Sequence, residues 1–413
     1  MFMGPGLPLR RNRDDRWEEP FDSCYPAAMS LPLRMGLYYG AIFVGTGVSA
    51  PYLPVWFAQH GLNGAEIGLI LSLPMLARAF TAPMLAVWAD SFHLRRTALI
   101  LLAAAVTGLY ALMALPFGFA WWAVVWFAAS SMYSALSPLT DVLVLSRAAR
   151  DRFNFGWPRG IGSACFIVGN VVMGAILTHG SPEFVLVWMV AAAGLASLAA
   201  RILLPPDPVH EEGHKAHLAD RMAGLGELLR DPVFMTATLS AGLIQSAHAF
   251  YYGFSTLAWK HQGIPESMTG ILWATGVTAE IGFMWFMEPW RRRVGPRNLL
   301  ALGGVAAVVR WTAFAFSPPL WLVFPLQTLH ALGYAATFLA SLQLVERLSS
   351  PRNASAAQSI NSALSGGLIS GLATMASGWL FDRYGAHGYL LMSAMSAAGL
   401  IGALRLYGMK RLA

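Results

Sequence analysis

Residues 35–58 read MGLYYGAIFVGTGVSAPYLPVWFA, a stretch without a charged side chain. At a helical rise of 1.5 Å per residue, it is long enough to cross the roughly 30 Å of hydrocarbon in a bilayer. Similar apolar stretches follow along the whole chain, so the sequence predicts an all-α membrane protein with twelve transmembrane helices. The predicted spans lie near residues 35–58, 65–89, 97–117, 120–145, 156–179, 183–204, 233–257, 267–288, 299–317, 320–345, 355–380 and 388–408.

The composition excludes a water-soluble enzyme. Only 12% of the 413 residues are charged, whereas a soluble protein carries about a quarter. The two cysteines, Cys24 and Cys165, lie in a polar tail and in an apolar span, and they cannot build a disulfide framework or a thiolate metal site. We therefore expect neither a metal nor another cofactor.

Polar segments divide the chain into two halves. Residues 205–232 hold several prolines and most of the His and Glu residues of the middle of the chain, which predicts a cytoplasmic linker. This linker separates an N-terminal six-helix bundle, residues 34–204, from a C-terminal one, residues 233–413. Residues 1–33 mix Arg with Asp and Glu and lack the apolar stretch of a signal peptide, so they predict a cytoplasmic polar tail.

The two halves carry related patterns. The Gly-Leu pair at 68–69 recurs 202 positions later as Gly-Ile at 270–271, and residues 192–195 recur 205 positions later as residues 397–400. Parallel repeats of six helices are typical of the major facilitator fold, in which substrate binds near the midplane between two rocking halves. We therefore expect the functional site at the interface of the halves.

Lysine and arginine predict the orientation. With both termini in the cytoplasm, the external segments hold only Lys260 and Arg383, and three further arginines lie within spans. This distribution predicts a multi-pass protein of the cell inner membrane. It also explains the net charge of +7 by anionic lipid rather than by nucleic acid. The expected partners are a small-molecule substrate, protons and the bilayer, with no obligate protein partner.

Ionisable side chains interrupt several spans. Such groups cost at least about 2.5 kcal/mol each in hydrocarbon, so they persist where they pair or face water. Asp141 and Arg159 lie on consecutive antiparallel spans, where a short hairpin can bring them together. The other four lie at one similar depth, which favours a shared wet cavity. The six residues are Arg78, Asp141, Arg159, Glu280, Arg310 and His330.

Polar side chains recur at helical spacing around these groups, as the wall of a cavity requires. The alternative is that they only link helices by hydrogen bonds, as in many membrane bundles. Aromatic residues beside them could stack on a ligand, or could pack against lipid or each other. The candidate wall residues are Phe166, His248, Tyr252 and Asn361.

Several motifs carry a resemblance to a known family. They lie at residues 137–141, 156–163, 247–255, 279–280 and 308–311. In these motifs the chain resembles the phenylpropionate permease family of the major facilitator superfamily over residues 34–408. The resemblance implies the twelve-helix fold and the import of an aromatic acid.

A more distant resemblance connects the chain to the lactose permease and its oligosaccharide symporter relatives. Asp141 and Arg159 fall on that family's sugar-binding acidic residue and arginine, with the same spacing of 18 residues. Glu280, Arg310 and His330 fall on its C-terminal substrate and proton network. The resemblance implies corresponding roles for these five residues.

The chain also departs from the lactose permease pattern. Gly333 stands where that family has its proton-carrying glutamate, and Gln327 stands at its lysine. Phe166 replaces the tryptophan that stacks on the sugar. The departures leave the proton carrier open and favour a ligand less polar than a disaccharide.

The superfamily's signature between the second and third helices is kept only in part. Asp90, Arg95 and Arg96 match it, which implies a cytoplasmic gate at these residues.

An aromatic carboxylate needs a cation for its head group and an apolar slot for its body. Arg159 and Arg78 are the candidate cations. The alternative for each is a structural ion pair, with Asp141 and with Glu280 respectively. We expect the aromatic wall residues to line the slot.

Proton coupling needs a carboxylate whose protonation changes with its surroundings. Glu280, with Arg310 and His330 on neighbouring helices, is the first candidate, and Asp141 is the alternative. His330 is expected to bridge by hydrogen bonds, and His248 to line the cavity.

The sequence thus predicts a secondary active transporter that imports a small aromatic or other organic carboxylate, such as 3-phenylpropionate, by proton symport. A sugar symporter and a drug or metabolite exporter of the same fold are the alternatives. An intramembrane enzyme is disfavoured because no nucleophile motif, paired-aspartate site or helical metal motif occurs within the spans.

Overall fold

A computed structural model describes residues 29–209, 224–350 and 352–409. The described residues are helical apart from short connections and one isolated bridge between Leu94 and Pro208. Most of the predicted tail 1–33, the middle of the predicted linker 205–232 and the last four residues lie outside the described part.

Six long helices form the N-terminal half. Each coincides with one predicted span, and the connections between them are short. They are α1 (Leu31–Gln59), α2 (Gly64–Asp90), α3 (Arg95–Met113), α4 (Phe119–Arg150), α5 (Gly156–Leu177) and α6 (Glu183–Leu203).

The C-terminal half follows the same order with more interruptions. It begins with the short helix α8 (Leu225–Arg230), and its spans are built from one or more segments each. The segments are α9 (Pro232–Ser246), α10 (Ala249–His261), α11 (Glu266–Phe286), α12 (Glu288–Ala315), α13 (Leu320–Thr328), η2 (Ala331–Ala336), α14 (Thr337–Leu348), α15 (Ala354–Asn361), η3 (Ser362–Ile369), α16 (Ser370–Tyr384), η4 (Gly385–Gly388), α17 (Tyr389–Arg405) and η5 (Leu406–Gly408).

Three of these spans are irregular at side chains that the sequence singled out. The predicted span 233–257 divides into α9 and α10 at His248, whose Nδ1 lies 3.0 Å from the carbonyl of Gln245. A side chain that bonds to its own backbone competes with the helical ladder. The π-helices η2 and η3 begin directly after His330 and Asn361. Such segments are rare in helices and are frequent at functional sites.

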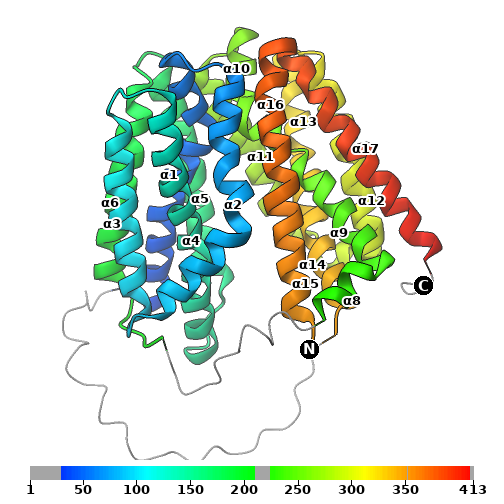
Figure 1. Ribbon diagram of the computed structural model, residues 1–413, viewed down its shortest axis with the longest axis horizontal. Coiled ribbons are helices and arrows are strands. Elements are labelled where there is room, and N and C mark those ends of the chain that lie inside the picture. Colours follow the sequence, from blue (N-terminus) through cyan, green and yellow to red (C-terminus); the bar gives the residue numbers. More distant parts are fainter. Residues whose placement is uncertain (1–28, 210–223, 351, 410–413) are drawn as a thin grey trace, which may run out of the picture.

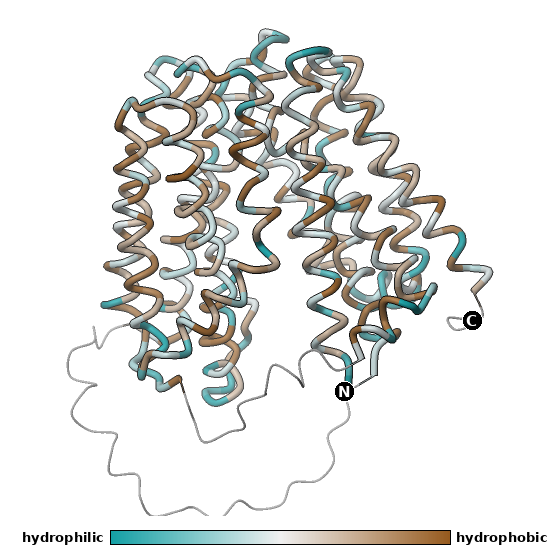
Figure 2. The backbone as a smooth tube through the Cα atoms, viewed as in Figure 1, coloured by the Kyte–Doolittle hydropathy of each residue, from teal (hydrophilic) through white to brown (hydrophobic). Residues whose placement is uncertain are grey.

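Nine helical stretches of the described residues are long and apolar enough to cross a membrane. They overlap all the predicted spans except 233–257, which is broken at His248, and 267–288, which contains Glu280. Figure 2 shows hydrophobic residues along the helices of both halves. Each predicted span nevertheless coincides with helix in the structure.

The halves meet at the end of the molecule away from the linker. There the carboxylate of Asp382 on α16 accepts from the backbone N–H groups of Gly64 and Ala65 on α2, at 2.7 and 2.8 Å. Thr256 Oγ1 donates to the carbonyl of Pro51 at 2.6 Å. Toward the linker the ribbons of the two halves diverge (Figure 1). The structure is therefore closed at the end opposite the linker.

Candidate functional site

Asp141 and Arg159 form an ion pair in the N-terminal half. Arg159 Nη1 donates to Asp141 Oδ1 at 2.7 Å and to Ser137 Oγ at 2.9 Å. Helices α4 and α5 both pack on α1, and the side chain of Arg159 reaches across to Asp141. Tyr39 on α1 also donates to Asp141 Oδ1, at 2.5 Å.

One edge of the Arg159 guanidinium makes hydrogen bonds, and another edge has no hydrogen-bond partner among the described residues. Its Cζ lies 5.5 Å from the centre of the Tyr39 ring and 5.0 Å from that of Phe43, within cation–π range. Among the described residues, side-chain hydrogen bonds engage only Nη1 of this guanidinium. The side chain is 39% exposed. Nη2 and Nε can therefore donate to a second carboxylate in bidentate geometry.

A second polar cluster lies in the C-terminal half around Arg310. This arginine is 1% exposed, and its Nη1 lies 3.1 Å from His330 Nδ1. Its Nη2 donates to Gln327 Oε1, and Gln327 Nε2 donates in turn to Tyr251 Oη at 3.0 Å. The ring of Trp311 lies 4.5 Å from the guanidinium carbon. Hydrogen bonds and aromatic faces thus compensate for the burial of this charge.

Glu280 extends this cluster to the less buried side. Its Oε2 lies 3.3 Å from His330 Nε2, and its side chain is 21% exposed. A guanidinium can only donate, so His330 Nδ1 must be the acceptor of the Arg310 hydrogen bond. Neutral His330 then carries its proton on Nε2 and donates it to Glu280. The arrangement is a relay from Glu280 through His330 to Arg310.

His248 lies in an aromatic surround next to this relay. Its ring centre is 4.9 Å from Trp311, 5.3 Å from His330, 5.5 Å from Tyr334 and 5.8 Å from Tyr252. The side chain is fully buried, and its Nε2 has no hydrogen-bond partner in the described structure. A buried imidazole nitrogen without a partner is costly, and a ligand atom or a water molecule could satisfy it.

Arg78 lies close to the other half. A Cβ at Gly366 on η3 of the C-terminal half would lie 3.8 Å from Arg78 Nη1. Arg78 is exposed and forms no ion pair with Glu280 within the described chain. The alternative interpretation of these two residues as an ion pair is therefore wrong for this conformation.

Two other predicted wall residues make more ordinary contacts. Asn361 Oδ1 accepts from Ser341 Oγ at 3.2 Å, directly before the π-helix η3. Phe166 on α5 is half-buried and packs against the hydrophobic core. Neither belongs to the two ionic clusters.

The residues of the predicted gate lie at the end of α2 and the start of α3. Asp90 is exposed at the end of α2, while Arg95 Nη2 donates to the carbonyl of Val209 at 3.0 Å and Arg96 Nη1 to that of Leu204 at 3.4 Å. Both arginines thus bind the chain that enters the linker. Asp207 in this chain forms an ion pair with Arg147, a contact that the sequence analysis did not predict.

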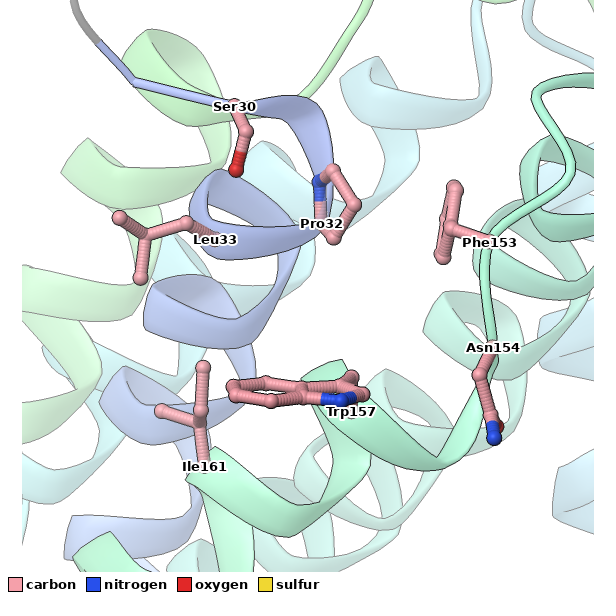
Figure 3. Close-up of a pocket in the computed structure, with 7 residues that line it drawn as sticks. All are labelled: Ser30, Pro32, Leu33, Phe153, Asn154, Trp157 and Ile161. Atoms are coloured by element: carbon pink, nitrogen blue, oxygen red, sulfur yellow. The ribbon is translucent and has the colours of Figure 1, made fainter.

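Sequence reasoning also missed Tyr39 and Phe43. Both lie in an apolar run of α1, and the signal that could have identified Tyr39 is a hydroxyl placed at helical spacing from the polar residue Thr46. A separate hollow of about 410 Å³ lies near the start of α1 and α5. Leu33, Phe153 and Trp157 are among the residues that line it (Figure 3). None of the predicted site residues lines it. The described residues contain no cluster of three or more side chains suited to a metal ion.

Comparisons with known proteins agree with this architecture. The family model described as "MFS_1 like family" matches residues 33–391. A probable 3-phenylpropionic acid transporter of Escherichia coli (strain K12) is 27% identical over 88% of this chain and 94% of its own length. A maltose permease of Geobacillus stearothermophilus is 30% identical over 91% of this chain and 95% of its own.

A solved structure has the same fold. The crystal structure of the nucleoside transporter NupG superposes with a TM-score of 0.78, at 17% identity, over 92% of this chain and all of that one. At this identity the likeness establishes the fold, which is the predicted one of two six-helix halves.

Proposed function

Since the chain belongs to the MFS_1 like family, we propose that this transporter imports a small aromatic carboxylate together with a proton. Membership makes it a multi-pass membrane protein of the major facilitator fold and a secondary transporter, not an enzyme. The substrate and the coupling ion are the proposed part. The single observation that supports them best is the open edge of the Arg159 guanidinium beside the rings of Tyr39 and Phe43.

The carboxylate of the substrate would bind to Arg159. Its Nη2 and Nε present two parallel donors, which is the geometry that favours a carboxylate. Arg78 is a second cation of the N-terminal half, and its Nη1 lies near Gly366 of η3 in the C-terminal half. A lone carboxylate therefore has a receptor in the N-terminal half.

The aromatic body of the substrate would lie against the C-terminal half. The rings of His330 and Tyr334 are stacked at 5.0 Å with an interplanar angle of 10°, and Tyr252 stacks on His248 at 5.8 Å. Flat aromatic faces contribute more than their buried area when another ring packs on them. The 3-phenylpropionic acid transporter among the relatives supports the same substrate class.

The proton would be carried by Glu280. Without substrate, the guanidinium groups of Arg78, Arg159 and Arg310 and the carboxylates of Asp141 and Glu280 sum to one positive charge. One substrate carboxylate that enters with one proton on Glu280 leaves this sum unchanged. Symport of one proton per anion would therefore avoid moving net charge through the membrane, which is costly.

We further propose the inner membrane as the location, with both termini and the linker on the cytoplasmic side, because lysine and arginine accumulate at that end. The end that is closed in the structure would then face outward. A sugar symporter is a second candidate, and the maltose permease relative at 30% identity favours it.

Uptake into proteoliposomes tests the proposal. We expect labelled 3-phenylpropionate to accumulate when the outside is acidic, and maltose not to. Arg159→Ala should abolish this uptake, whereas Arg201→Ala, at an exposed arginine of α6, should not. Maltose uptake without aromatic acid uptake would establish the second candidate instead, and dependence on neither pH nor Arg159 would overturn the mechanism.

A further inference from the structure

Tyr39 fixes both members of the ion pair in the N-terminal half. Its hydroxyl donates to Asp141 Oδ1 at 2.5 Å, the oxygen that also accepts from Arg159 at 2.7 Å. Its ring lies 5.5 Å from the guanidinium carbon. Tyr39 is fully buried, whereas the side chains of Asp141 and Arg159 are 31% and 39% exposed. A buried side chain thus contacts both members of a partly exposed ion pair.

The pair matters most when no substrate is present. A transporter that works by alternating access must return empty after it releases its substrate, and its chamber is closed on both sides during that return. A guanidinium without a counter-charge is costly in such a closed chamber. In the loaded transporter the substrate carboxylate supplies a counter-charge to Arg159. In the empty transporter, Asp141 is the carboxylate in contact with it.

We infer that Tyr39 is a positioning residue that keeps Asp141 on Arg159, so that the pair is neutral whenever the chamber is empty. The inference rests on the proposed function, because it assumes an anionic substrate at Arg159. It predicts that Tyr39 acts mainly on the return of the empty transporter. Net uptake requires that return, whereas exchange of internal for external substrate does not.

The test compares net uptake with exchange in proteoliposomes, using labelled 3-phenylpropionate. Tyr39→Phe removes the hydroxyl and keeps the ring. The ratio of net uptake to exchange should fall about tenfold, as expected for the loss of one hydrogen bond to a charged group. Asp141→Asn should lower the ratio further. The matched control is Tyr38→Phe, because Tyr38 is the adjacent buried tyrosine and its hydroxyl has no hydrogen-bond partner among the described residues. Its ratio should stay within about twofold of the wild type.

Equal losses of uptake and exchange in Tyr39→Phe, or an unchanged ratio, would overturn the inference, because a merely structural role lowers both rates alike. If Tyr39→Phe does not fold, the ratio in Asp141→Asn decides. Stimulation by a pH gradient should persist in Tyr39→Phe, which separates this defect from loss of the proton carrier. If the wild type transports no carboxylate, the proposed function fails and the inference fails with it. If it transports one with an unchanged ratio in Tyr39→Phe, only the inference fails.

Discussion

Removing the carboxylate of Asp382 should shift the balance between the two ends of the transporter. Asp382 belongs to α16 of the C-terminal half, yet it accepts hydrogen bonds from Gly64 and Ala65 at the start of α2 in the N-terminal half. These contacts can exist only while this end is closed. Helix α2 keeps its own cap without Asp382, because Asn63 Oδ1 accepts from the backbone N–H of Glu66 at 2.9 Å. Asp382→Asn should therefore affect the contact between halves and not the helix.

The magnitude follows from the geometry of these two bonds. A carboxylate that caps a helix N-terminus contributes about 0.5–2 kcal/mol, and the favourable position at the positive end of the helix dipole is included in such values. Asp382 is exposed, so solvent weakens its interactions. We take ~1.4 kcal/mol, which corresponds to a tenfold change in the equilibrium between the closed and open states of this end.

Distances between spin labels on the two halves measure this equilibrium. Labels at Ala149 on α4 and Ser355 on α15, both exposed near the linker end, should move closer together when the opposite end opens. In Asp382→Asn, the population with the shorter distance should rise about tenfold relative to the longer one. Arg383→Gln at the next position is the control. If the short-distance population of Asp382→Asn stays within twofold of that of the wild type, Asp382 does not hold this end closed.

Three further predictions follow from other contacts. Glu280→Gln should abolish accumulation driven by a pH gradient, because the glutamine side chain cannot release a proton to the relay. Gradient-driven uptake into proteoliposomes measures this accumulation. Retained accumulation would rule out Glu280 as the proton carrier. Gly378→Val should open the closed end more than Asp382→Asn does, since even a Cβ at Gly378 would lie 3.0 Å from Gly68 Cα. The same spin-label distances measure this opening, and an unchanged distribution of distances would contradict the close packing. Arg147→Ala should lower the melting temperature of the purified protein by several degrees. It leaves the carboxylate of Asp207, a residue only 9% exposed, without its ion pair. An unchanged melting temperature would mean that the pair is not stabilising.

The helices could be predicted because their apolar length is a local property. Every predicted span coincides with helix, and the contact of Asp141 with Arg159 joins two successive spans, as the sequence predicted. The contact of Tyr39 with Asp141 could not be predicted, because it depends on how α1 packs on helices about 100 residues away. An aromatic residue in an apolar run gives no sign of such a partner.

Depth along a helix is also not enough to predict a pair. Arg78 and Glu280 lie at corresponding positions of α2 and α11, but Glu280 contacts His330 and not Arg78. The direction in which each side chain points around its helix depends on packing between the halves. The break at His248 escaped prediction for a related reason, since a side chain that bonds to its own backbone leaves the apolar pattern intact. The roles of these residues in transport stay predictions.

The π-helices η2 and η3 have a consequence for comparing the two copies of the repeat. A π turn closes its hydrogen bond one residue later than an α turn, so each such segment accommodates an inserted residue. The offset between the copies is 202 near the start of α11 and 205 near the end of α17, and both π segments lie in between. Two insertions can supply two of those three extra residues. Residue equivalences between the copies that assume a constant offset therefore hold for α2 and α11 but are wrong by one or more residues beyond Ala331. Chimaeras that exchange segments between the copies should be joined before that residue.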